Sequence, residues 1–206
     1  MAVTDILLAG ADLWYAPVGE ALPDPSTIGP GDDWGGNWIS LGVMSAPLTL
    51  IEETEVTDHL KNSALAVVKR SRKSQLFSFQ SALDEINATH EALVRGYDPA
   101  NVVTTTAAGP AQIGMDLFDP NSGGGCGRNI AEWQLGAEGI LCTPTDDLAF
   151  HRVFIEKGNF MPDGDLVFDG QGDGVVLPFV FKSLWVPAHA KGLAYKLQRM
   201  TAVATA

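Results

Sequence analysis

The stretch TLIEETEVTDHL, residues 49–60, decides how the fold is predicted. It has the alternation of a β-strand, yet acidic side chains occupy both of its faces. Glu53 and Glu55 share one face of the pleat, whereas Glu52 and Asp58 lie on the other. A strand with acid on both faces is not buried in a core, so we predict an edge strand, an extended hairpin arm or a wall exposed to water.

The following stretch, SALAVVKRSRKSQLFSFQSAL (residues 63–83), supplies the second limb of that hairpin. Its middle is the basic run KRSRK, residues 69–73, and alternation resumes from Leu76 to Leu83. We therefore predict one long hairpin with an acidic limb, a basic limb and a tip near HLKNSA. Opposite charges on the two limbs favour contact either within the hairpin or with a neighbouring molecule.

Charge is distributed unevenly along the chain, whose formal net charge is −12. Residues 1–60 hold ten acidic side chains and no lysine or arginine, whereas the remainder holds fifteen acidic and thirteen basic ones. Such a surface repels phosphate, because nucleic-acid affinity comes mainly from cations that displace counterions. Sequence-specific DNA binding is therefore not expected. An acidic surface past which DNA slides without adhering is compatible with this charge.

The rest of the 206-residue chain also has mainly β patterns, and we predict a single domain over residues 1–206. Residues 20–37 are rich in proline and glycine and are predicted to form a long loop, and residues 186–206 a C-terminal arm. One helical segment is predicted over 84–96, with acidic residues in its first turn, Arg95 in its last and Gly96 as the residue that ends it. The predicted class is a β-sandwich or partial barrel with one flanking helix, a long hairpin and extended terminal arms.

Sequence signatures of catalysis or of cofactor binding are weak. The glycine-rich GGGCGRN (residues 123–129) lacks the Gly-Lys-Ser/Thr ending of a phosphate loop, and DGQGDG (residues 169–174) has Val180 where a calcium loop needs glutamate. The four histidines have no metal-ligand spacing, and Cys126 and Cys142 form no recognisable framework. We predict no catalytic residue, no metal and no cofactor. No membrane insertion and no secretory signal are expected, so synthesis in the cytoplasm is the natural inference.

Four stretches, taken in order, resemble a known family. They are ILLAGADLWYAPVG (residues 6–19), WISLGVMSAPLTLIEETEV (38–56), FSFQSALDEIN (77–87) and VVLPFVFKSLW (175–185). Their order is similar to that in the major tail tube protein of long-tailed, non-contractile bacteriophages and of gene transfer agents. The segment 97–147 matches no pattern of the family.

This resemblance implies a β-sandwich with one helix. Six copies are expected to form a ring whose inner strands join into a continuous barrel, and the rings are expected to stack into a hollow tube. It implies a place in the virion tail after synthesis in the bacterial host, with DNA passing through the lumen without specific binding. The expected partners are other copies of the chain and the tail terminator, tape-measure and tail-tip proteins. Long hairpins and terminal arms of such proteins usually bridge subunits or successive rings.

Three groups of residues are candidates for contacts in such an assembly. An acidic face for the lumen or for contact between rings, with the lumen preferred, is predicted at Glu52, Glu53, Glu55 and Asp58. A basic face between subunits is predicted at Lys69, Arg70, Arg72 and Lys73, and interface aromatics at Trp14, Trp34 and Trp38.

Two other functions stay open at this point. One is another virion component, such as a tail terminator or a capsid-decorating protein. The other is a β-sandwich module that binds carbohydrate through exposed Trp34 and Trp38, which flank the glycines of the long loop. An enzyme is not expected, because no constellation of residues supports one.

Overall fold

Strands dominate the computed structural model, which describes residues 11–42, 44–61, 66–84, 87–105, 115–117, 130–142, 148–164, 167–168, 175–186 and 195–199. The first strands are β1 (Asp12–Pro17), β2 (Ile39–Ser40), β3 (Thr49–Lys61) and β4 (Ala66–Leu83). After the helix α1 (Ala88–Val94) and the 3-10 helix η1 (Pro99–Asn101) come β5 (Val103–Thr105), β6 (Met115–Leu117), β7 (Trp133–Cys142), β8 (Leu148–Pro162), β9 (Val167–Phe168), β10 (Val175–Ser183) and β11 (Tyr195–Arg199). The predicted mainly β class with one α-helix is confirmed.

Nine strands form one antiparallel sheet, in the order β2-β1-β7-β8-β10-β4-β3, with β11 paired to β8 and β9 paired to β10. The strands β5 and β6 form a separate two-stranded sheet. Among the described strands the sheet does not close into a barrel, because β2 and β3 stand at its two ends. Within the predicted C-terminal arm, β11 is a sheet strand, which the weak pattern of residues 186–206 did not indicate.

The main core lies on one face of this sheet. Alternate residues of β1, β7, β8, β10 and β4 supply it, because side chains two apart on a strand share a face. Aromatic rings join strands that are not neighbours: Tyr15 on β1 meets Phe160 on β8 edge to face at 6.4 Å, although β7 lies between them. The fully buried rings of Phe179 and Phe181 on β10 complete this cluster around Phe160.

The helix begins later than predicted. It spans only Ala88–Val94, because the side chain of Asn87 caps it by accepting a hydrogen bond from the backbone N–H of His90 at 2.8 Å. Asp84 therefore lies before the helix and not in its first turn, and Glu85 lies outside the described residues. The predicted role of Gly96 is confirmed, since it has a φ of 80° and follows the C-cap residue. Arg95 is that C-cap residue and does not lie in the last turn, which ends at Val94.

The long proline- and glycine-rich loop covers the other face of the sheet. Residues 20–38, which we call the strap, carry Trp34 and Trp38 onto a second buried cluster with Ala16 and Phe154. The sequence predicts this segment as a loop, and no strand is found in it. Its packing role was not predicted. In the part of the chain that the structure describes, no helix has the length and apolar character to cross a membrane.

Candidate functional site

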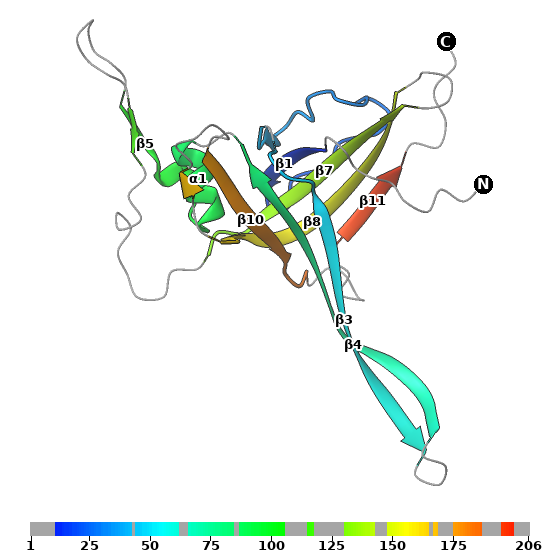
Figure 1. The fold of residues 1–206 in the computed structure, drawn as a ribbon. Coiled ribbons are helices and arrows are strands. Elements are labelled where there is room, and N and C mark those ends of the chain that lie inside the picture. Colours follow the sequence, from blue (N-terminus) through cyan, green and yellow to red (C-terminus); the bar gives the residue numbers. More distant parts are fainter. Residues whose placement is uncertain are drawn as a thin grey trace, which may run out of the picture.

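The predicted hairpin is present and reaches far from the body of the molecule (Figure 1). The strand β4 pairs with β10 only from Ser78 to Leu83, and beyond that point the register gives it β3 as its partner. We call residues 52–61 of β3 and 66–76 of β4 the hairpin arm. Among the described strands, neither limb of the arm has a second neighbour.

Solvent surrounds the acidic limb on both sides. All eight side chains of residues 52–59 are exposed, including the apolar Val56, of which 56% is exposed. A strand that contributes to a core buries every second side chain. The arm therefore adds nothing to the core of its own chain over this stretch.

Two irregularities fall on the basic limb. Between Glu55 and Val56 the partner residue changes from Ser74 to Arg72, which leaves Lys73 as an extra residue of β4. A second irregularity follows His59 and likewise adds a residue to β4. The alternation of β3 is thus uninterrupted, so Glu53 and Glu55 share one face and Glu52 and Asp58 the other.

One contact joins the two predicted charged groups within the chain. Arg70 Nε lies 2.9 Å from Asp58 Oδ1 in a directly opposed pair. This ion pair is exposed, so it contributes at most about 1 kcal/mol to folding. At the end of the arm next to the body, Glu52 accepts hydrogen bonds from Thr54 Oγ1 at 3.1 Å and from Gln75 Nε2.

The remaining members of the predicted basic group are only partly described. Lys69 is exposed and lies opposite His59. Arg72 and Lys73 belong to β4, and their side chains lie outside the described residues.

The predicted interface aromatics occupy a different place from the arm. Only 3% of Trp34 and 6% of Trp38 are exposed, and Trp14 is half-buried and stacks on Trp34 with ring centroids 5.4 Å apart. The idea that Trp34 and Trp38 are exposed and form a platform for sugar is wrong, because the strap folds them against Phe154.

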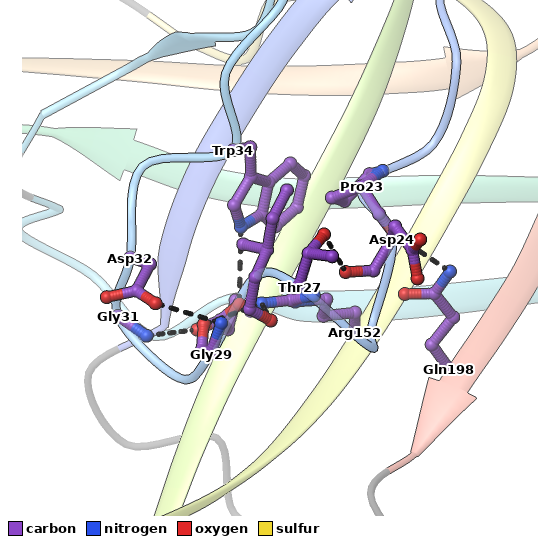
Figure 2. Close-up of polar contacts among 11 residues, drawn as sticks. Pro23, Asp24, Thr27, Gly29, Gly31, Asp32, Trp34, Arg152 and Gln198 are labelled. Carbon is purple, nitrogen blue, oxygen red and sulfur yellow. Dashed lines mark hydrogen bonds and ion pairs between the residues drawn. The ribbon is translucent and has the colours of Figure 1, made fainter.

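A buried ion pair between Arg152 and Glu138 fixes the strap to the sheet, and the sequence analysis did not predict it. Figure 2 shows Arg152 among the residues of the strap. Arg152 Nη2 donates to the carbonyl oxygens of Ile28 at 3.1 Å and Gly29 at 2.9 Å. Glu138 accepts from the backbone N–H of Gly31 at 2.6 Å and from Trp34 Nε1 at 3.2 Å. The available signal was a charge within an apolar stretch of each strand, LGAEGIL (residues 135–141) of β7 and AFHRVFI (residues 149–155) of β8, since such charges are buried only when paired.

A second contact holds the strap further along. Gln198 on β11 donates from Nε2 to the carbonyl oxygen of Pro23 at 3.3 Å (Figure 2). Asp24 accepts from the Ser26 side chain and backbone at 2.7 and 2.8 Å, and these hydrogen bonds lower the pKa of the Asp24 carboxyl.

Two other groups near the strap have altered acidity. Burial raises the pKa of Asp12, and the neighbouring charge of Glu138, which it opposes across β1 and β7, adds to the increase. Burial also raises the pKa of the Tyr15 phenol, with a smaller effect from Asp98.

The described part of the chain contains no group of three or more His, Cys, Asp or Glu side chains arranged to hold a metal. The glycine-rich residues 123–129 and the calcium-like residues 169–174 lie outside the described residues. Among the described residues, the arm combines exposure on both faces, dense charge and strand edges without a second neighbour, which folding alone does not explain.

Comparison with known proteins gives no match to a protein-family model and none to a curated protein sequence.

Proposed function

We propose that this protein is a structural subunit that assembles with copies of itself into stacked hexameric rings, forming the hollow tail tube through which bacteriophage DNA passes. The observation that carries the proposal is the hairpin arm, a two-stranded ribbon exposed on both faces and far from the core (Figure 1). The resemblance of the sequence to tail tube proteins is the basis for proposing stacked rings and six copies in each ring.

Physical reasons favour a partner for the arm. A two-stranded hairpin alone is marginally stable in water, and an unpaired strand edge invites pairing with another chain. The arm, residues 52–61 and 66–76, extends beyond the body with ten residues of β3 and eleven of β4. Evolution shortens or blocks such edges in proteins that remain monomeric. Completion of the sheet by other copies explains why this one is long.

Exposed apolar side chains elsewhere on the chain support additional contacts. Ile39 on the end strand β2 is 51% exposed. On the small β5–β6 sheet, Val103 lies opposite Leu117, and both are more than half exposed, as is Met115. These side chains lie on short strands at the periphery, where neighbouring subunits of a ring would meet.

The acidic limb agrees with a conduit for DNA. Each phosphate contact by a cation would add affinity and slow passage, whereas carboxylates repel phosphate. Glu53 and Glu55 share one face of the arm, and we assign that face to the lumen. The tail terminator, tape-measure and tail-tip proteins are the partners expected at the ends and inside of such a tube.

Electron microscopy of the purified protein in negative stain tests the proposal. We expect rings or tubes with a central hole. A monomer that persists at all concentrations and salt conditions would overturn it. Single rings that never stack would favour the alternative of a tail terminator, because a tube subunit must also bind along the axis.

A variant with a shortened arm tests whether the arm is needed for assembly. Residues 54–75 are replaced by Asn-Gly, the two-residue turn that best suits a hairpin, so that Glu53 and Leu76 remain opposed. Since residues 52–59 bury no side chain, the body should fold with a nearly unchanged melting temperature. Assembly should be lost. Rings of normal size from this variant would show that the arm is not the assembly element.

A further inference from the structure

We propose that the strand β11 sets the direction of the hairpin arm relative to the body, through the contact of Tyr195 with Phe77 at the root of the arm. The inference rests on the proposed function in one respect, namely that assembly needs an arm held in one direction. The direction itself is a property of a single chain and can be measured without assembly.

The arm leaves the sheet at Phe77. The last pair of the β4–β10 ladder is Ser78 opposite Lys182, so the next step places Phe77 beside Ser183. There the N–H of Phe77 donates to Ser183 Oγ at 2.9 Å, and both residues are buried. A buried backbone N–H needs an acceptor. The Ser183 hydroxyl supplies it where the ladder ends, so the two strands part without an unsatisfied donor at this position.

The strand β11 occupies the place next to this point. It pairs with β8 over residues 151–155, whereas β10 pairs with β8 over residues 158–162 and β7 lies along the opposite edge of β8. The strands β10 and β11 therefore follow one another along the same edge. Among the described strands β4 pairs with β10 but not with β11, so the arm separates from the sheet where β10 gives way to β11 (Figure 1).

An aromatic contact joins the root of the arm to β11. The ring centroids of Phe77 and Tyr195 lie 4.4 Å apart, and the ring planes are tilted by 46°. Phe77 is buried, whereas Tyr195 is half-buried and packs against the main core. Phe77 also lies opposite Glu52, the first residue of the arm on β3. Tyr195 therefore contacts the arm at its root, and a contact there limits the directions that the whole arm can take.

Few contacts hold β11 itself. In the described sheet it pairs only with β8. Lys196 forms an ion pair with Glu156, and Gln198 donates to the carbonyl oxygen of Pro23 in the strap at 3.3 Å. Lys196 and Leu197 are exposed, and none of the described side chains of β11 is fully buried. Because segments with few buried contacts are less stable than the core, β11 can be altered by mutation without unfolding of the body.

A fixed direction of the arm favours association. Any part that moves in the free subunit must be ordered when partners bind, and this ordering weakens binding. Beyond Ser78 neither strand of the arm pairs with the body in the described part of the chain. An arm that Tyr195 already holds at its root therefore loses less conformational freedom when copies assemble.

Double electron–electron resonance between two nitroxide labels measures the direction of the arm. The labels are attached to cysteines that replace two exposed residues, Thr57 in the arm and Ile39 in β2. Cys126 and Cys142 are replaced by serine in every labelled protein. Labelled chains are diluted with a large excess of unlabelled protein, so that only distances within one chain are recorded. We expect one narrow distance distribution in this parent protein.

Variants in β11 test the role of Tyr195. Tyr195→Ala removes the ring, and Tyr195→Leu keeps apolar bulk without a ring, so both should broaden the distribution. Tyr195→Phe retains the ring and should keep the distribution narrow. The matched control is Leu197→Ala, which also removes a large side chain from β11, at a position that is 52% exposed, and should likewise keep it narrow. Melting temperatures verify folding, and a merely structural role of Tyr195 would lower them without broadening the distribution.

The outcomes separate this inference from the proposed function. An unchanged distribution in Tyr195→Ala and Tyr195→Leu would overturn the inference, as would equal broadening in Leu197→Ala or a broad distribution in the parent protein. Each of these results is independent of assembly. A wild type that never assembles overturns the proposed function, while the distances still decide whether Tyr195 directs the arm.

Sedimentation velocity of the unlabelled variants tests the connection between the two. At a concentration at which the wild type assembles, Tyr195→Ala should lose assembly, and Tyr195→Phe and Leu197→Ala should retain it. If Tyr195→Ala broadens the distance distribution but assembles like the wild type, assembly does not need a fixed direction of the arm, and that part of the inference is overturned.

Discussion

Glu138 and Arg152 face each other across β7 and β8, fully buried, with Glu138 Oε2 and Arg152 Nε 2.5 Å apart. Neither charge is compensated by its partner alone. Arg152 also holds two carbonyl groups of the strap, and Glu138 holds a backbone N–H and the Trp34 indole. The pair is therefore the point at which a long irregular segment is fixed to the sheet.

Removal of one charge of this pair should be strongly destabilising. Arg152→Met leaves the Glu138 carboxylate buried without its counter-charge, and we expect a loss of about 3–5 kcal/mol in the free energy of unfolding. The double variant Glu138→Leu, Arg152→Met should lose much less than the sum of the two single variants. Urea unfolding followed by tryptophan fluorescence measures this, and additive losses would show that the two side chains act independently.

The close packing of Trp34 on β7 gives a second prediction. A Cβ at Gly136 would overlap the Trp34 ring and would also lie 3.0 Å from Phe154 Cδ1. We expect Gly136→Ala to cost about 1–3 kcal/mol through overpacking. In a Trp34→Ala background, which itself should cost about 3–5 kcal/mol, the same change should cost clearly less. An equal cost in both backgrounds would place the strain elsewhere than at the strap.

Asp12 should make stability depend on pH. Its folded-state pKa is raised above the ordinary 3.8, first by burial and then by Glu138, so the native state binds this proton more tightly than the unfolded state. The ionisation of Asp12 therefore costs stability as the pH rises above 3.8. We expect Asp12→Asn to gain stability relative to the wild type over that rise and to level off above the folded-state pKa. Unfolding curves at several pH values measure the difference, and a difference independent of pH would contradict the assignment.

The end of α1 provides a fourth prediction. Gly96 has a φ of 80°, and a Cβ there would lie 2.7 Å from Ile130 Cγ2. Its N–H donates to the carbonyl of Leu93 and that of Tyr97 to the carbonyl of Ala92, a pairing typical of a helix ended by glycine. Gly96→Ala should cost at least about 1 kcal/mol from the left-handed backbone alone, and the contact with Ile130 should add to it.

The matched control for this position is Asn87→Ala at the other end of the helix. Loss of its cap should cost about 1 kcal/mol without any steric overlap. If Gly96→Ala proves harmless in urea unfolding while Asn87→Ala does not, the helix ends differently from the structure described.

Features that depend on interactions between neighbouring segments of the chain could be predicted from the sequence, whereas features that depend on distant segments could not. The hairpin was predicted well, because alternation, the acidic run and the basic run lie in adjacent segments. As expected, β3 and β4 pair, from Thr49 opposite Gln80 to Lys61 opposite Ala66. The helix was predicted to start four residues too early, since acidic residues favour a first turn but the side chain of Asn87 caps the helix. The two bulges on β4 left no signal in the alternation of β3.

The placement of the tryptophans was beyond local patterns. Trp34 and Trp38 lie among glycines and acids in the sequence, which is typical of an exposed loop, yet both are buried. Their partners Trp14 and Phe154 come from β1 and β8, and the charges that fix the loop come from β7 and β8. No periodicity within the loop encodes contacts with strands more than a hundred residues away.

The sequence by itself determined the mainly β class, the long hairpin and the separation of acid from base along its two limbs, because these follow from alternation and from the order of charges. Only the tertiary structure decided that Glu138 and Arg152 meet, that the strap covers one face of the sheet, and that the arm stands clear of the core. Those features depend on which strands become neighbours. That choice is made by burial of side chains far apart in the chain, and it has no local signature.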